Sequence, residues 1–440
     1  MKKKLFIALS IILAGLTSCE KNSVLDTQEM NQSSEPSFIV LDESEVTEHE
    51  LYEMTIGDMK KSVDADIFDG VDKVYKEANQ NQDAEQGATT KALAPLLYKV
   101  VRIEYKTLDQ NMAPVNTSAL IVYPLLRKMD KVMLINHGTQ IGFAMIPTKY
   151  TSVEAIMAAT GALCILPDYI GLGSTSDHPD LYLNHEVHGR TSVDALIALL
   201  DYAKAKKLAL DKSYKSYIVG YSQGGSVSLA SLRRVQQLDM DTQKRINLDK
   251  VYCGDGPYDL RRTFETYMEE YKQGKKMGLG SVVPLVINSM FNSYPSEVTD
   301  MKYEDFFTDW ALSTGVPQAV KNNRENIIDM MLKFNGKSLG DILNMEYITE
   351  HPNHLAKLLE LMDRQNLCHG WQPQYKLKLL HGDPDGVVPF SNFEEAVGGL
   401  SNSYVETKVI SNKSILLSDP LLQHINGMVV MLEEILSGKF

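Results

Sequence analysis

The sequence predicts an α/β protein with a mostly parallel β-sheet and helices on both faces. Strand-like apolar runs begin near Leu97 and occupy 98–106, 118–123 and 132–135, after which strands alternate with helix-like stretches. Such alternation calls for a parallel sheet that is covered on both faces. The 440 residues are 44% hydrophobic, which is enough for a sizeable core, and no internal repeat is visible. We therefore expect one large α/β domain over 93–440.

The N-terminus has the plan of an export signal. Three lysines precede an apolar run over 5–16, an order typical of a secretory signal peptide. The run is too short for a lasting membrane span. The string Leu-Thr-Ser-Cys that ends at Cys19 resembles a bacterial lipoprotein processing site. This resemblance implies that 1–18 is a signal peptide, that Cys19 carries lipid, and that the protein is anchored at the cell envelope, on the outer membrane or periplasmic side. A soluble secreted protein is the alternative.

Residues 19–92 are expected to contain a tether and a helical region. Residues 20 to about 45 are rich in Ser, Asn, Gln and acidic residues, which suits a flexible tether from the membrane. Residues 46–92 include helix-like acidic pieces such as 62–79, and the sequence assigns them no role.

The most informative motif is a glycine-rich turn around Ser222. The string Gly-Tyr-Ser-Gln-Gly at 220–224 follows the strand-like run 217–219 and precedes a helix-like stretch, which is the strand-turn-helix setting of a nucleophile elbow. Such a turn holds the serine in a strained conformation and brings strand and helix close together. Its neighbours must therefore lack bulk, and the glycines at 220, 224 and 225 meet this demand. An ordinary glycine-rich turn is the alternative.

An elbow serine needs a base and a carboxylate that orients the base, in the chain order Ser, Asp or Glu, His. The strand-like segment 375–380 ends in a loop that contains Asp383 and Asp385. His424 is the only histidine after these acids, and it opens an apolar helix-like stretch over 425–436. A lone histidine there is by itself more often a surface or capping residue. The combined order favours a triad of Ser222, one of the two acids and His424.

The oxyanion hole is expected from two backbone N–H groups, one after the nucleophile and one in the loop after an early strand. Gln223 supplies the first. The strand-like run 131–135 leads into Asn-His-Gly-Thr at 136–139, where the glycine lets the loop turn beneath the substrate. We therefore expect the N–H of Thr139 to be the second donor. His137 precedes the serine in the chain, and we interpret it as a brace of this loop and not as the base.

With these motifs the chain resembles an α/β-hydrolase of the secretory lipase type over roughly 95–440. The more specific marks are Pro-Asp-Tyr-Ile-Gly-Leu-Gly at 167–173, His-Pro at 178–179 and Gly-Arg-Thr-Ser-Val-Asp-Ala at 189–195. They are similar to the family's segment between the fourth strand and the helix before the elbow. Within the first string we interpret Asp168 as a structural carboxylate.

The resemblance also selects between the two acids of the late loop. The string His-Gly-x-x-Asp-x-x-Val-Pro that starts at His381 looks like the acid loop of α/β-hydrolases. It implies that Asp385 is the triad acid. Asp383 is then a turn former, a role that Asp beside Pro fills readily.

About a hundred residues separate the strand-like run 248–254 from the acid loop. Helical periodicity of Met, Leu, Ile and Phe predicts helices at 258–277, 284–291, 323–334, 339–347 and 354–361. We expect a helical cap insertion at about 258–370 that sets the acyl or alcohol preference, although most of its apolar residues only bury the helices against each other. Glu269 and Glu270 within it could bind a peptide N-terminus, but we expect them to face solvent.

Cysteine, metal and charge patterns limit the remaining classes. Cys164 and Cys253 lie in strand-like runs and are expected to be buried thiols, with a bridge between Cys253 and Cys368 as the alternative. No Cys-x-x-Cys or His-Glu-x-x-His spacing occurs, so we expect no catalytic metal. Removal of residues 1–18 takes away three lysines and no acid and changes the formal charge from −13 to −16. This charge argues against nucleic acid as a partner.

The leading function is hydrolysis of a carboxylic ester by an esterase or lipase that needs no cofactor, with Ser222 as nucleophile, His424 as base and Asp385 as the acid. The substrate is then a small-molecule or lipid ester, which the fold alone does not specify. A serine peptidase on the same fold would use the same triad, but the N-terminal region is too short for a propeller gate. An esterase acting on acylated glycans is a further alternative. A binding protein without catalysis has no chemical need for these three residues in this order.

Overall fold

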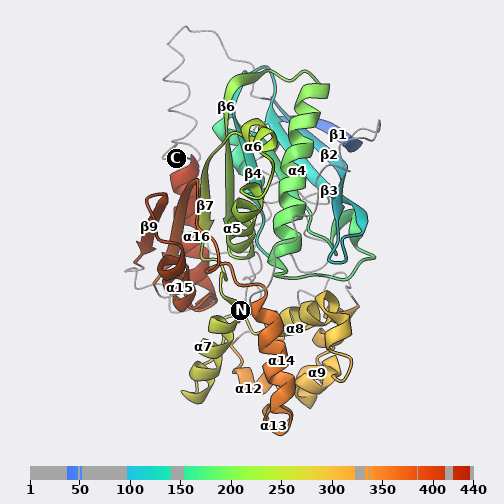
Figure 1. The fold of residues 1–440 in the computed structure, drawn as a ribbon, viewed down its shortest axis with the longest axis vertical. Coiled ribbons are helices and arrows are strands. Elements are labelled where there is room, and N and C mark those ends of the chain that lie inside the picture. Colours follow the sequence, from blue (N-terminus) through green and yellow to red (C-terminus); the bar gives the residue numbers. More distant parts are fainter. Residues whose placement is uncertain are drawn as a thin grey trace.

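The fold is arranged around one nine-stranded sheet. Figure 1 shows the computed structural model as a ribbon. The structure describes residues 37–47, 50–51, 97–139, 153–322, 332–334, 336–383, 385–411 and 420–436. The strand order is β1-β2-β3-β5-β4-β6-β7-β8-β9. The pairs from β1 to β5 are antiparallel, whereas the pairs from β5 through β4 to β9 are parallel. The prediction of a mostly parallel sheet is confirmed.

The strands in the centre of the sheet are buried on both faces, which explains their continuous apolar runs. Val251 of β7 lies in the core on one face, and the next residue, Tyr252, lies in the core on the other face. The strands are β1 (Phe38–Thr47), β2 (Leu97–Leu108), β3 (Pro114–Pro124), β4 (Met129–Asn136), β5 (Leu163–Pro167), β6 (Leu210–Tyr221), β7 (Leu248–Gly254), β8 (Lys376–Gly382) and β9 (Val405–Ile410).

Helices cover both faces of the sheet. One face packs against α4 (His185–Ala205), α5 (Gln223–Val235), α6 (Met240–Ile246) and α15 (Ser391–Leu400). The other face packs against the 3-10 helix η4 (Val153–Thr160) and against α16 (Pro420–Leu436). Burial of two apolar faces is the dominant stabilising contribution in such a domain. α4 begins after Asn184, whose side chain accepts a hydrogen bond from the N–H of Val187 and so caps the helix.

The predicted helical insertion lies between β7 and β8. In Figure 1 its helices, coloured yellow to orange, gather beyond one end of the sheet. They are α7 (Leu260–Lys272), α8 (Val282–Ser293), α9 (Asp309–Ser313), α10 (Val316–Lys321), α12 (Leu339–Ile342), α13 (Met345–Glu350) and α14 (Pro352–Asp363), with the 3-10 turns η6 (Pro295–Glu297), η7 (Tyr303–Phe306) and η8 (Leu332–Phe334).

The insertion differs from the expected helices in its details. The helix expected over 339–347 is divided into α12 and α13, because Leu343 is extended and forms a β-bridge with Phe307. The short helices α9 and α10 were not expected. Most of the helix expected over 323–334 lies outside the described residues, as do the helix-like pieces expected within 52–92.

Part of the expected tether is instead an edge strand. Residues 38–47 form β1, which pairs antiparallel with β2. The acidic composition that suggests a tether is explained by ion pairs across the two strands. Arg102 of β2 lies 3.0 Å from Asp42, and Lys99 lies 3.2 Å from Glu43 and 3.3 Å from Glu45. Charged side chains are a common feature of edge strands because they discourage further pairing.

The cysteine prediction is confirmed in its main form. Cys164, Cys253 and Cys368 are all buried free thiols, so the alternative bridge between Cys253 and Cys368 is not formed. Burial raises the pKa of Cys164 and of Cys253 well above the ordinary value of a thiol. Cys19 lies outside the described residues. In the described part of the chain, no helix is long and apolar enough to cross a membrane.

Candidate active site

The turn between β6 and α5 holds Ser222 in a strained conformation. Its backbone angles are φ 66° and ψ −127°, a region that non-glycine residues adopt only where the surroundings impose it. The turn is fixed by a hydrogen bond of 2.8 Å from the N–H of Ser222 to the carbonyl oxygen of Gly254. Ser222 is buried to 4% exposure, so only a group that enters the site reaches its hydroxyl.

The glycines around Ser222 are required by close backbone packing. A Cβ atom on Gly220 would lie 2.1 Å from the carbonyl oxygen of Gly224, and one on Gly225 would lie 2.3 Å from that of Gly254. A Cβ on Gly224 would lie 2.0 Å from the carbonyl oxygen of Asn136. Each distance is a severe clash. All three positions therefore require glycine, as predicted from the sequence, and the end of β4 lies directly against the turn.

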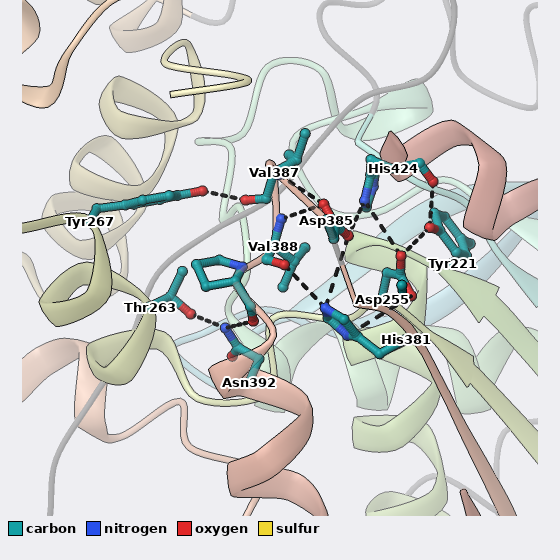
Figure 2. Close-up of polar contacts among 12 residues, drawn as sticks. Tyr221, Asp255, Thr263, Tyr267, His381, Asp385, Val387, Val388, Asn392 and His424 are labelled. Carbon is teal, nitrogen blue, oxygen red and sulfur yellow. Dashed lines mark hydrogen bonds and ion pairs between the residues drawn. The ribbon is translucent and has the colours of Figure 1, made fainter. Parts of the chain in front are cut away.

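The acid loop after β8 places Asp385 against His424. Oδ2 of Asp385 lies 2.6 Å from Nδ1 of His424, while its Oδ1 accepts hydrogen bonds from the N–H groups of Val387 at 2.8 Å and Val388 at 3.0 Å. Figure 2 shows these contacts. Asp383 in the same loop is exposed, and it is Asp385 that meets the histidine.

His424 is held deep in the molecule with one ring nitrogen left available. It lies in α16, which begins at Pro420, so the helix starts four residues earlier than the sequence suggested. Since a carboxylate only accepts, Nδ1 carries the proton toward Asp385. Among the described residues, Nε2 is buried and has no hydrogen-bond partner. Burial alone lowers the pKa of His424, but the charge and hydrogen bond of Asp385, together with the charge of Asp255, raise it above the ordinary value.

A second buried carboxyl group, Asp255, lies beside this pair. Its Oδ2 is 3.8 Å from Nδ1 of His424 and contacts the hydroxyl of Tyr221, and its Oδ1 accepts a hydrogen bond of 3.1 Å from the N–H of Gly382. The Tyr221 hydroxyl also lies 2.5 Å from the main-chain oxygen of His424. Asp255 was not among the site residues predicted from the sequence. The available signal was its position immediately after the predicted strand 248–254, at the same edge as the ends of β6 and β8.

Burial controls the charge of the groups around Asp255. Desolvation raises the pKa of Asp255 to about 7, and the neighbouring Asp385 raises it as well, against the lowering effect of His381 and His424. His381 is fully buried, and desolvation lowers its pKa. Its Nε2 donates to the carbonyl oxygen of Val388 at 3.1 Å. His381 is therefore a neutral ring near neutral pH and does not provide a cation for Asp255.

The two expected oxyanion donors lie on adjacent loops. Gln223 is the first residue of α5, so its N–H is among the unsatisfied donors at a helix N-terminus. Thr139 follows β4, and its hydroxyl lies 2.7 Å from the hydroxyl of Tyr182. The two loops are in contact, since a Cβ on Gly138 would lie 3.8 Å from the carbonyl oxygen of Tyr221.

His137 lies in the same loop as Thr139 and is packed as a brace. Its ring stacks on Tyr169 at a centroid distance of 4.1 Å, and the Tyr169 hydroxyl donates to the carbonyl oxygen of His137 at 3.0 Å. The next strand end is fixed in a similar way: Asp168 accepts a hydrogen bond of 2.6 Å from the hydroxyl of Ser118, which ties the loop after β5 to β3.

Two groups of side chains among the described residues have a spacing that could hold a metal ion. The first is Asp255, Asp385 and His424, where Asp385 and His424 already hydrogen-bond to each other. The second consists of Asp259, His369 and Glu395. In this group the Asp259 carboxylate caps α7 and accepts from Asn366 at 2.9 Å. Both groups are therefore explained by contacts within the chain.

Comparisons with known proteins identify the fold. No protein-family model matches the chain, and no curated protein matches it in sequence. Similar solved structures include the rice cell wall degrading esterase LipA from Xanthomonas oryzae, with a TM-score of 0.66, 16% identity and coverage of 91% of this chain and 98% of that chain. A putative hydrolase from Legionella pneumophila has a TM-score of 0.66 and 16% identity, with coverage of 91% and 96%. Lipase A from Candida antarctica in its closed state has a TM-score of 0.52 and 12% identity, with coverage of 78% of each chain. The chain has the α/β-hydrolase fold.

Proposed function

We propose that this protein is a carboxylic ester hydrolase of the esterase or lipase type, in which Ser222 is the nucleophile, His424 the base and Asp385 its orienting acid. The observation that carries the proposal is the buried contact of 2.6 Å between Asp385 and His424, formed at the same sheet edge as the strained turn of Ser222. The fold shared with esterases and lipases supports the same class.

The reaction follows from the protonation of these groups. Nε2 of His424 accepts the Ser222 proton while the serine oxygen bonds to the ester carbonyl carbon, and the imidazolium that forms is stabilised by ionised Asp385. The N–H groups of Thr139 and Gln223 stabilise the oxyanion. The C–O bond to the alcohol then breaks, and the alcohol leaves with the proton from His424. Water attacks the acyl-enzyme by the same route and releases the carboxylic acid and free Ser222.

The hydrogen bonds of Asp385 suit the role of the acid that orients His424. A carboxylate that accepts two N–H bonds and one imidazole bond is held as an anion in a fixed orientation. It therefore fixes the imidazole with Nε2 free to act as a base. Removal of its charge would leave the imidazolium without the carboxylate that is hydrogen-bonded to it.

The helical insertion supports an ester with an apolar part. Val282, Val286 and Met290 of α8 belong to one continuous apolar cluster that also contains Val387 and Val388 of the acid loop. A cap with such a cluster favours an apolar acyl or alcohol group. An acylated glycan is the second candidate, because the similar structure from Xanthomonas oryzae is a rice cell wall degrading esterase.

The peptidase alternative has less support. Glu269 and Glu270 are the acids that could hold a peptide N-terminus, but Glu269 is exposed and lies 3.9 Å from Arg262. Glu270 is 3.2 Å from Lys275 at the surface. Both acids thus have local cationic partners, in agreement with the expectation that they face solvent.

Assays of residues 20–440 with p-nitrophenyl esters of increasing chain length and with peptide anilides distinguish these functions. Ester turnover with a preference for one range of chain lengths, and no anilide cleavage, is expected. Anilide cleavage that exceeds ester turnover would favour a peptidase, and turnover of acylated glycans alone would favour the second candidate.

We also propose that Cys19 anchors the protein to the cell envelope by a lipid. A diacyl group with an added acyl chain binds membranes far more strongly than one myristoyl chain. Cys19→Ser should move the protein from the membrane fraction to the soluble fraction and abolish metabolic labelling with a fatty acid. Equal labelling of both forms would exclude the anchor.

A further inference from the structure

The Tyr221 hydroxyl has two buried oxygen atoms as neighbours but only one proton to donate. The Tyr221 hydroxyl contacts Oδ2 of Asp255 and the main-chain oxygen of His424. A hydroxyl has one proton, and a main-chain carbonyl has none to give. Both contacts are satisfied as hydrogen bonds only when Asp255 is protonated and donates to Tyr221, while Tyr221 donates to His424.

We propose that Asp255 is a positioning residue for His424: it keeps a proton beside ionised Asp385 and, through the hydroxyl of Tyr221, fixes the main chain that carries the catalytic imidazole. The inference rests on the proposed role of His424 as the base. Figure 2 shows the chain of contacts from Asp255 through Tyr221 to His424.

The hydrogen bonds decide which of the two acids keeps the proton. Two buried carboxyl groups whose oxygens lie within 4.8 Å of each other do not readily both ionise. The described contacts of Asp385 are two backbone N–H bonds and the imidazole, all of which favour the anion. Asp255 accepts one backbone N–H, from Gly382, and contacts one hydroxyl, that of Tyr221. The anion is therefore better stabilised at Asp385, and the proton remains on Asp255.

The other titratable groups that face Asp255 do not change this assignment. His381 has Nδ1 3.9 Å from Oδ1 of Asp255 and is neutral, because burial lowers its pKa. Tyr258 is fully buried, and desolvation raises its pKa, as it does for Tyr221. The nearest cation is thus His424 itself in its protonated form, at 3.8 Å.

In this arrangement the pKa of His424 depends on the charge of Asp255. Desolvation raises the pKa of Asp255 to about 7, so part of this group is ionised near neutral pH. Each negative charge near His424 favours its protonated form. The Asp255 charge therefore raises the pH at which the base becomes active, and a variant without this charge should become active at lower pH.

Two substitutions at Asp255 test whether this residue acts as a proton donor or as an ionised acid that orients His424. Asp255→Asn keeps a neutral group that donates to Tyr221 and accepts from Gly382, whereas Asp255→Ala keeps neither bond. We expect Asp255→Asn to retain kcat/KM within about threefold at pH 8 and to shift the rising limb of its pH profile to lower pH. We expect Asp255→Ala to lose about 10- to 100-fold, the effect of buried groups left without partners. Tyr221→Phe should resemble Asp255→Ala.

The matched control is Asp363→Asn in α14. Asp363 is also a buried carboxyl group whose pKa is raised to about 7, mainly by desolvation, and it lies outside the proposed machinery. This variant should leave the pH profile unchanged. A loss in Asp255→Asn as large as that in Asp385→Asn would overturn the inference, because Asp255 would then act as an anion. Equal activities of the Asn and Ala variants would overturn it as well.

Infrared spectroscopy tests the protonation without any substrate. The wild-type protein should show a carboxylic acid C=O band at pH 6 that decreases by pH 8, and Asp255→Asn should lose a component of this band that Asp363→Asn keeps. Absence of such a component contradicts the inference. If the band is present but no ester is hydrolysed, the proposed function fails and the assignment of the proton stands.

Discussion

The polar cluster at the ends of β6, β7 and β8 and the helical insertion between β7 and β8 are both buried, but they are built differently. In the cluster, Asp385, Asp255, Tyr221 and His424 are linked by directional hydrogen bonds. The insertion instead packs apolar side chains, such as those of α8, into a continuous core. Apolar packing tolerates volume-conserving changes, whereas a hydrogen-bonded buried cluster does not tolerate the loss of one member.

This difference assigns separate tasks to the two regions. The hydrogen bonds of the cluster fix the positions of its protons and charges, as an acid–base reaction requires. We expect the insertion to set a substrate preference without disturbing the chemistry. Loss of a hydrogen bond within the cluster should therefore affect turnover strongly, and changes in the insertion should have small effects.

The largest effect is expected at the nucleophile. Ser222→Ala should lower ester turnover by about 10⁴- to 10⁶-fold, because no acyl-enzyme can form, and should leave the fold unchanged by circular dichroism. Ser231→Ala, a buried serine further along α5 whose hydroxyl donates to Val227, is the matched control and should keep its activity. Activity of Ser222→Ala within tenfold of wild type would end the assignment.

The base should control the pH dependence. His424 must be neutral to accept the Ser222 proton, and its pKa is raised because the attraction of Asp385 and Asp255 exceeds the lowering effect of burial. The kcat/KM of the free enzyme should therefore rise with pH through an ionisation above the ordinary histidine value of about 6.5 and then level off.

Two histidine variants test this assignment. His424→Ala should lose both the activity and the rising limb. His137→Ala should keep the limb even where the rate falls through a disturbed oxyanion loop. A His424→Ala variant with the wild-type profile would place the base elsewhere.

The two acids of one loop should differ sharply. Asp385→Asn removes the charge that stabilises the imidazolium, so a loss of about 10⁴-fold in kcat is expected. Asp383→Asn, at an exposed position two residues earlier, should change kcat by no more than a few-fold. Steady-state kinetics on both variants measures the difference. The reverse result would show that the acid loop is in a different register.

The smallest effect is expected where the insertion supports the cluster. Tyr267 of α7 donates a hydrogen bond to the carbonyl oxygen of Val387, whose N–H holds Asp385. Tyr267→Phe should reduce stability by about 0.5–1.5 kcal/mol and kcat/KM by a few-fold. Tyr271→Phe on the same helix is the control, since its hydroxyl has no hydrogen bond to the described residues. A loss of kcat/KM by orders of magnitude in Tyr267→Phe would contradict the distinction between the polar cluster and the helical insertion.

The sheet and the site differ in how far the sequence predicts them. The central strands are predicted because burial on both faces requires continuous apolar runs, and β7 has the expected bounds of 248–254. β1 was missed because its acidic residues pair with Lys99 and Arg102, more than fifty residues away in the chain. The composition of a short segment does not reveal pairing with residues so far away in the chain.

The same reasoning applies to the site residues. Ser222, Asp385 and His424 could be proposed because their chain order and the elbow glycines carry a chemical requirement. Asp255 has only its position after the strand 248–254 as a signal, since its contacts depend on β7 and β8 lying side by side and on Tyr221 reaching His424. The breaks between the insertion helices were likewise set by tertiary contacts such as the bridge between Phe307 and Leu343.

The central claim is that Ser222 forms a covalent acyl-enzyme with the help of His424. Reaction of the protein with a fluorophosphonate, followed by mass spectrometry of the peptides, tests this claim directly. The account predicts one modified peptide that contains Ser222, no modification in Ser222→Ala, and much slower modification in His424→Ala. Modification of a different residue, or ester turnover that continues after Ser222 is fully modified, would contradict it.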